Sequence, residues 1–170
     1  MKPPNSRLLD DLRSLPRPFW VLFAGTFINR FGTFVWPVLT LYLTRQGHSL
    51  TAASCALAAW GLGSFVGNAL GGWMTDHLGR RDTIVGGTLA AATSLMGLYG
   101  AESLPVILLF TALTGLANGT YHPAASALLA DVVPPALRVR AYAAFRLAAN
   151  AGFAGGAAVG GMLAPVLAES

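Results

Sequence analysis

The chain has 170 residues, of which 54% are hydrophobic and only 11% are charged. Soluble domains carry about 25% charged residues, so this composition excludes an ordinary soluble domain and indicates a protein that lies in lipid. The formal net charge of +4 comes from basic residues dispersed between apolar segments, which argues against a surface for nucleic acid. A single cysteine, Cys55, leaves no intrachain disulfide or cysteine metal cluster, and no cofactor is predicted.

Residues 1–17 carry both charge signs and no small-residue cleavage site, so we predict a cytoplasmic lead-in rather than a signal peptide. Five apolar segments follow, and a bilayer core about 30 Å thick takes about 20 helical residues to cross. The predicted spans are 18–44, 51–75, 83–101, 104–130 and 140–167, followed by a tail at 168–170. The fold prediction is an all-α integral membrane protein. Pro37 and Pro123 lie inside predicted spans and are expected to kink them.

The distribution of basic residues predicts the orientation. The lead-in, the second loop and the fourth loop together hold eight Lys and Arg residues, whereas the first loop holds only Arg45 and the third holds none. Short loops rich in Lys and Arg stay in the cytoplasm. We therefore expect the N-terminus inside, in a membrane of the bacterial plasma (inner) membrane type.

Glycines recur every fourth residue in two of the predicted spans. Such stripes let helix backbones approach closely in lipid, where no hydrophobic effect drives helices together. We predict helix-packing roles for both sets. They are Gly63, Gly67 and Gly71 in the second span, and Gly152, Gly156 and Gly160 in the fifth.

Polar residues of three spans are predicted to reach a shared depth. At about 1.5 Å of rise per residue, Arg30 lies about 18 Å from the cytoplasmic end, close to the midplane. Asn118 and His122 come out at about 20 and 13 Å, and Asn150 near 15 Å. An arginine at this depth costs from about 2.5 to over 10 kcal/mol, so it should face a protein interior or a wet cavity. The predicted substrate or coupling residues are Asn29, Arg30, Asn118, His122, Arg146 and Asn150.

Less specific roles stay open for several of these residues. Arg30 could be satisfied by amides and carbonyls in a structural network, His122 could be a packing residue, and Arg146 could snorkel to the interface. On the fourth span the polar face is expected to line the same cavity. Its members are Gly115, Asn118, Gly119, His122 and Ser126.

No carboxylate is available at the predicted midplane, because all seven acidic residues lie at span ends, in loops or in the lead-in. A proton carrier must then be His122, because histidine is the side chain whose unperturbed pKa, about 6.5, lies near neutral pH, or an acid outside these residues. We therefore expect Arg30 to pair with an acidic substrate or with a partner outside these 170 residues. With no nucleophile, metal pair or nucleotide loop visible, the chain is not expected to be an enzyme.

The stretch GGWMTDHLGRRD, residues 71–82, lies between the second and third spans. It strongly resembles the loop signature of major facilitator superfamily transporters. The resemblance implies that Gly72 permits close packing, Asp76 acts at the cytoplasmic gate, Gly79 permits the turn, and Arg80 and Arg81 supply pairing donors. At position 77, where many relatives carry Lys or Arg, this chain has a histidine.

The fifth span is similar to the family's antiporter glycine motif, with Ala143 at its leading glycine and Ala157 at its usual proline. Gly115 stands where many proton-coupled relatives carry arginine. The resemblance implies the first five helices of a six-helix N-terminal half, and a proton-linked exporter of a small organic molecule that works by alternating access. Its partners would be the bilayer, the substrate, protons, and a missing C-terminal half or another copy. The alternative is a truncated, non-transporting membrane module that assembles with or regulates another membrane protein.

Overall fold

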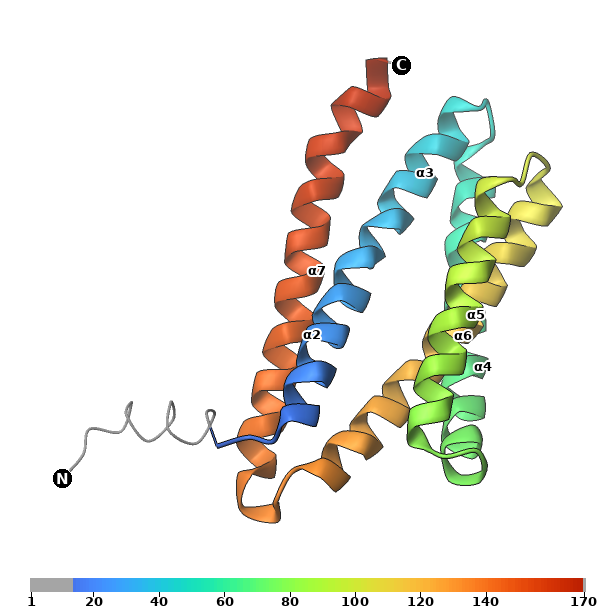
Figure 1. Cartoon of the computed structure of the whole chain (residues 1–170). Helices are drawn as coiled ribbons and strands as arrows, with labels where there is room; N and C mark the ends of the chain where they lie inside the picture. Colours follow the sequence, from blue (N-terminus) through green and yellow to red (C-terminus); the bar gives the residue numbers. More distant parts are fainter. Residues whose placement is uncertain (1–13, 170) are drawn as a thin grey trace. The chain divides into compact units, whose positions relative to one another are not determined.

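The computed structural model describes residues 14–169, and their side chains except those of 37 and 163–169 (Figure 1). All regular structure in this range is helical, which confirms the predicted all-α class. The elements are α2 (Arg17–Phe31), η1 (Gly32–Phe34), α3 (Val35–Arg45), α4 (Leu50–His77), α5 (Arg80–Tyr99), α6 (Leu104–Val132), η2 (Pro135–Leu137) and α7 (Arg138–Glu169).

The first predicted span is two α-helices, α2 and α3, joined by the 3₁₀ turn η1. Proline has no N–H and its ring clashes with the carbonyl four residues earlier, so Pro37 disfavours regular α-helix at residue 33. The Thr33 hydroxyl donates to the Arg30 carbonyl at 2.6 Å within this turn. The interruption expected at Pro37 therefore lies one turn before it, whereas α6 continues through Pro123 without ending.

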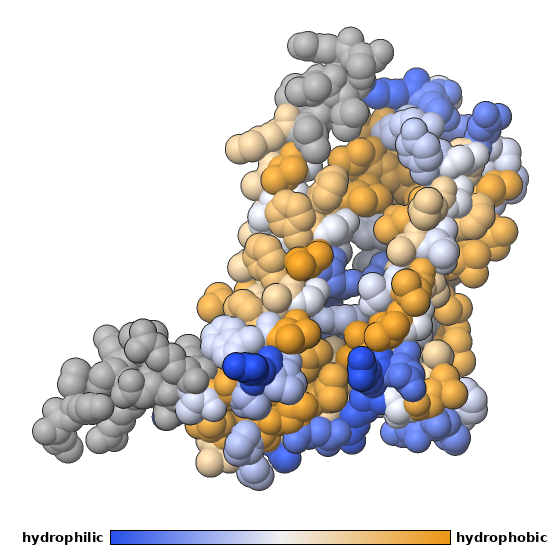
Figure 2. Space-filling view, in the orientation of Figure 1, coloured by the Kyte–Doolittle hydropathy of each residue, from blue (hydrophilic) through white to orange (hydrophobic). Residues whose placement is uncertain are grey.

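Two helices in the described part of the chain, α4 and α6, are long and apolar enough to cross a membrane by length and composition. Large apolar side chains of α4 are exposed, among them Phe65 at 77% and Leu62 at 69%. Figure 2 shows hydrophobic residues over most of the visible length of the helices, with hydrophilic residues gathered towards their ends. Such a surface suits lipid or another apolar helix better than water.

The residues group into two compact units, and each is described by itself. The first, called the α2–α7 unit, contains the described residues up to Val35 and those from Leu129 onward. The second, called the central unit, runs from Trp36 to Leu128 and contains α3, α4, α5 and most of α6.

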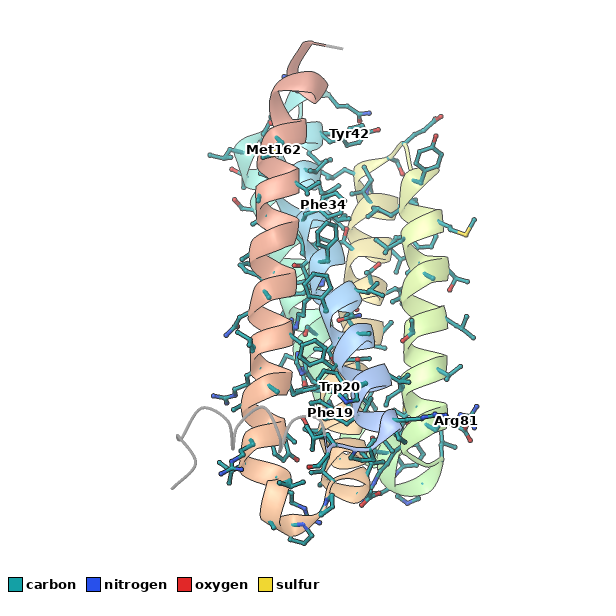
Figure 3. All side chains as sticks on the ribbon, turned by 60° about the vertical axis from the view of Figure 1, so that its left-hand side comes forward. Phe19, Trp20, Phe34, Tyr42, Arg81 and Met162 are labelled. Atoms are coloured by element: carbon teal, nitrogen blue, oxygen red, sulfur yellow. The ribbon has the colours of Figure 1, made fainter. Side chains whose placement is uncertain are left out.

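In the α2–α7 unit the two long helices run parallel and side by side (Figure 1). Gly152 lies against the carbonyl of Phe27, and Gly156 lies against the carbonyl of Phe31. One turn further, Gly160 lies beside Phe34, which Figure 3 labels. The glycine stripe of α7 thus allows direct backbone contact with α2, where Cα–H groups can face carbonyl oxygens.

In the central unit, α4 and α6 interlock through glycines on both helices. A Cβ atom added at any of four glycines would come within 3.0 Å of backbone of the facing helix, closer than real Cβ atoms approach. The facing pairs are Gly63 with Ala112, Gly67 with Leu116, Gly115 with Trp60, and Gly119 with Ser64. Neither helix could rotate or take a larger side chain here without separating the pair.

A third helix joins this contact at Thr120 of α6. Its backbone lies against Gly71 of α4, and its hydroxyl oxygen lies against Gly87 of α5. The same hydroxyl donates to the carbonyl of Ala117 at 2.8 Å, so the buried polar group is satisfied within its own helix. α4, α5 and α6 therefore meet around one small side chain.

We predict that Gly67→Ala destabilises the central unit, whereas Gly61→Ala on the same helix does not. The added methyl group at position 67 would overlap the Leu116 backbone, and overpacking typically costs about 1–3 kcal/mol. At Gly61 nothing lies within 4 Å of the added atom, and alanine favours helix over glycine by about 1 kcal/mol. Thermal unfolding in detergent should show a lower Tm for the first variant alone. Equal Tm values for the two variants would contradict the close contact.

Candidate functional site

The junction between α4 and α5 is a tight reversal built on Gly79. This residue has φ +95° and ψ 155°, a backbone conformation that side-chain-bearing residues rarely adopt. Its carbonyl accepts the N–H of Thr83 at 3.1 Å and the Thr83 hydroxyl at 2.8 Å, which closes the first turn of α5. The turn fixes Arg80 and Arg81 as the first two residues of α5.

The two arginines lie in different surroundings. Arg80 is half-buried, and its Nη1 donates to the carbonyl of Ala127 on α6 at 3.0 Å. Arg81 is exposed and extends away from the start of α5 in Figure 3. Arg80 therefore ties the start of α5 to the last turns of α6, while the guanidinium of Arg81 makes no hydrogen bond or ion pair within residues 14–169.

Asp76 lies in the last turn of α4, with its carboxylate exposed. It has no hydrogen-bond or ion-pair partner among the described residues. A carboxylate near a helix C-terminus meets the negative end of the helix dipole, which is unfavourable by roughly 0.3–1 kcal/mol at an exposed position. The dipole of α4 thus slightly disfavours the negative charge of Asp76 at this position.

The residues next to Asp76 shape its surroundings. His77 stacks on Trp73 with ring centroids 4.6 Å apart, and its Nδ1 donates to the Trp73 carbonyl at 2.8 Å. Because a carbonyl only accepts, this bond fixes a proton on Nδ1. Gly72 has no atom within 4 Å of an added Cβ, so the face of α4 that leads to Asp76 is open.

Four of the predicted polar residues belong to the α2–α7 unit. Asn29 and Arg30 of α2 are half-buried, whereas Arg146 and Asn150 of α7 are exposed. The Cβ of Arg30 lies 3.0 Å from an added Cβ at Gly152, so Arg30 sits on the contact between the two helices. Asn150 precedes that glycine by about 3 Å of helical rise, but two residues turn it to the opposite side of α7. Arg30 and Asn150 therefore lie at a similar height along the two helices, but Asn150 is on the side of α7 that faces away from Arg30.

The other two, Asn118 and His122, lie on α6 in the central unit and are half-buried. The His122 ring meets Tyr121 edge-on at 6.3 Å. Gly115 and Gly119 were expected to line a cavity with them, and the structure corrects this. Both glycines are buried against α4. The residues without side chains on this face of α6 are the ones that let α4 approach closely, so they are covered by α4 and do not line a cavity.

Sequence reasoning missed one contact of these residues and left two exposed residues of α7 out of the predicted site. It did not foresee that the Ala127 carbonyl would receive Arg80, because a backbone acceptor has no sequence signal. It also left out Arg138 and Tyr142, which precede Arg146 on α7 at intervals of four residues and are exposed. This second omission was readable, since residues four apart share a helix face.

Comparison with known proteins identifies the family. The family model described as Major Facilitator Superfamily matches residues 22–168. The chain belongs to the major facilitator superfamily. This confirms the resemblance seen in residues 71–82, and it agrees with the all-α architecture described above.

Similar proteins are found in Bacillus subtilis and Staphylococcus aureus. The uncharacterised MFS-type transporter YttB of B. subtilis is 36% identical over 152 residues, which cover 88% of this chain and 38% of YttB. The uncharacterised MFS-type transporter YqjV of B. subtilis is 29% identical over 83% of this chain and 35% of its own length. The quinolone resistance protein NorA of S. aureus is 26% identical over 88% of this chain and 39% of NorA. The chain thus spans less than two fifths of each relative.

We predict that Arg80→Met lowers the stability of the central unit, while Arg81→Met leaves it nearly unchanged. Removing the guanidinium of Arg80 deletes a charge-assisted hydrogen bond to Ala127, and such bonds contribute about 1.5–3 kcal/mol when shielded from water. Since Arg80 is only half-buried, we expect about 1–2 kcal/mol. Denaturant or thermal unfolding of both variants in detergent measures the difference. Equal losses would show that the bond to Ala127 is not what distinguishes the two arginines.

Proposed function

We propose that the chain forms part of a secondary transporter that exports a small organic molecule by alternating access in exchange for protons. The observation that carries this proposal is the α4–α5 junction. There Arg80 is bound to α6, whereas Asp76 and Arg81 are exposed and have no hydrogen-bond or ion-pair partner in the part of the chain that the structure describes. Membership of the family and its transporter relatives support the same reading.

In this proposal the junction is a cytoplasmic gate, with the N-terminus of the chain on the same side of a bacterial inner membrane. A carboxylate that is unfavourable at its own helix end gains by meeting the positive N-terminus of another helix. We place that helix in a C-terminal half or in another copy. Contact of Asp76 with that helix would stabilise one state of the gate, and loss of this contact would allow the gate to change to the other state.

The substrate and coupling residues of this proposal are Asn29, Arg30, Asn118, His122, Arg146 and Asn150. Arg30 carries the strongest expectation, because a guanidinium at membrane depth is costly unless it serves a polar site. Gly152 supports this role by allowing α7 to pass directly beside the Arg30 Cβ, which limits where the side chain can extend. A substrate that reaches Arg30 would meet a fixed positive charge.

A non-transporting membrane module remains the second candidate, and one observation favours it. Gly61 and Gly72 on the exposed face of α4 have open space around an added Cβ, so another helix could pack there closely. Substrate movement in reconstituted vesicles separates the two functions, since a module that only assembles with a partner would move nothing.

We predict that Arg30→Ala strongly reduces transport by the complete protein in proteoliposomes. A quinolone is the first compound to test, since quinolone resistance is the named property of the relative NorA. Losing the charge should reduce quinolone flux by about tenfold or more, which corresponds to about 1.4 kcal/mol of lost stabilisation. Arg45→Ala, at the exposed end of α3, is the matched control and should transport normally. Undiminished flux in the Arg30 variant would remove this residue from the site.

We predict that His122→Gln uncouples proton movement from substrate movement. An imidazole can bind and release a proton near neutral pH, whereas an amide of similar size cannot. In vesicles loaded with a pH-sensitive dye, a substrate gradient should acidify or alkalinise the lumen only when His122 is present. His48→Gln, in the α3–α4 loop, serves as the control histidine. Full proton flux in the His122 variant would assign coupling to an acid outside these residues.

A further inference from the structure

Helix α7 carries four exposed hydrogen-bond donors, and the inner two, Arg146 and Asn150, lie on a side of the helix away from the glycines that pack on α2. The members recur every fourth residue, and we call them the α7 donor stripe. They are Arg138, Tyr142, Arg146 and Asn150, all exposed. The face that packs on α2 holds different residues, among them the buried Gly152 and Gly156. At about 1.5 Å per residue the stripe extends for about 18 Å along the helix.

The charge of this stripe is unbalanced within its unit. The acidic residues among 14–35 and 129–169 are Asp131, at the end of α6 and seven residues before Arg138, and Glu169, at the end of α7. Arg146 lies about 12 Å inside α7 from its first residue. It makes no hydrogen bond or ion pair within the described residues, and neither does Asn150. A guanidinium among lipid tails is costly, so at this depth it gains from a polar or anionic partner.

Apolar side chains flank the inner end of the stripe. Phe153 is 60% exposed and Leu147 is 65% exposed, on either side of the Arg146–Asn150 pair. A ligand that offers only an anionic group would leave these surfaces uncovered. An amphipathic molecule, with one anionic group and an apolar body, would cover both.

We propose that the α7 donor stripe binds the anionic group of the transported molecule, and that this molecule is a small organic anion bearing a carboxylate, sulfonate or phosphate. The inference rests on the proposed transport function. Arg146 supplies the charge, Asn150 supplies an amide donor one turn deeper, and Phe153 contacts the apolar body. Arg138 adds positive charge near the helix start, where its Nε donates to the Val133 carbonyl at 3.3 Å.

The test uses two thiol reagents of similar size and opposite charge as probes of the full chain in lipid vesicles. The native cysteine is removed by Cys55→Ala, and a single reporter is introduced by Asn150→Cys. The two reagents are the anionic sulfonatoethyl methanethiosulfonate and its cationic trimethylammonium counterpart. The rate of cysteine modification by each reagent is first divided by the rate of the same reagent with a free thiol in solution. The anionic value divided by the cationic value is the anion-to-cation ratio. Ala151→Cys reports a neighbouring exposed position on another face of α7.

We expect the anion-to-cation ratio at Asn150→Cys to exceed the ratio at Ala151→Cys by about tenfold, because Arg146 lies one turn away. Adding Arg146→Gln should bring the two ratios together, and Arg146→Lys should keep them apart. Equal ratios at the two reporters, or no reaction of Asn150→Cys with either reagent, would overturn the proposal. The second result would mean that lipid or protein covers the stripe.

Vesicle composition distinguishes a lipid phosphate from a transported anion. A high ratio in phosphatidylcholine vesicles that disappears when phosphatidylglycerol is added would assign Arg146 to a lipid headgroup and overturn the proposal. These rates do not depend on transport. Absent quinolone flux would therefore count against the proposed function alone, while a selective Asn150→Cys reaction would still establish the anion site.

Discussion

The close approach of helix backbones at glycine is the contact on which the structure depends. In each unit a backbone carbonyl oxygen of one helix occupies the space that a Cβ atom would take on the neighbouring helix. The Leu116 carbonyl lies against Gly67 in this way, and the Phe31 carbonyl lies against Gly156. Lipid gives apolar side chains no reason to cluster, so the distance between backbones decides how well two helices hold together. One of these contacts also brings Gly152 of α7 beside Arg30 of α2.

Composition and spacing predicted the all-α class, because runs of apolar residues and their loops are local properties of the chain. The family was readable from residues 71–82 for a similar reason, since that signature is short and has a fixed spacing. What the sequence could not show is which side of a helix its neighbour occupies. Gly115 and Gly119 fall on one face with Asn118 and His122 by spacing alone, yet α4 occupies the glycine part of that face.

The conspicuous residues of the motif at 71–82 divide into two physical roles. Gly79 and Arg80 build the junction, one through its backbone conformation and the other through its bond to Ala127. Asp76 and Arg81 contribute nothing to the described structure and remain exposed. The sequence pattern presents all of them as equal members of one motif. The distinction depends on a backbone acceptor 47 residues away, which no pattern in the loop reveals.

The parallel α2–α7 pair has a consequence for the order in which the chain can assemble. Phe27 and Gly152 touch although they are 125 positions apart, whereas Gly67 and Leu116 are only 49 apart. During synthesis the interlocked α4 and α6 can meet while α7 is still inside the ribosome, and α2 must wait without its partner. Until then Arg30 has no neighbouring α7. A quality-control factor that recognises exposed charge in the membrane would therefore encounter α2 first.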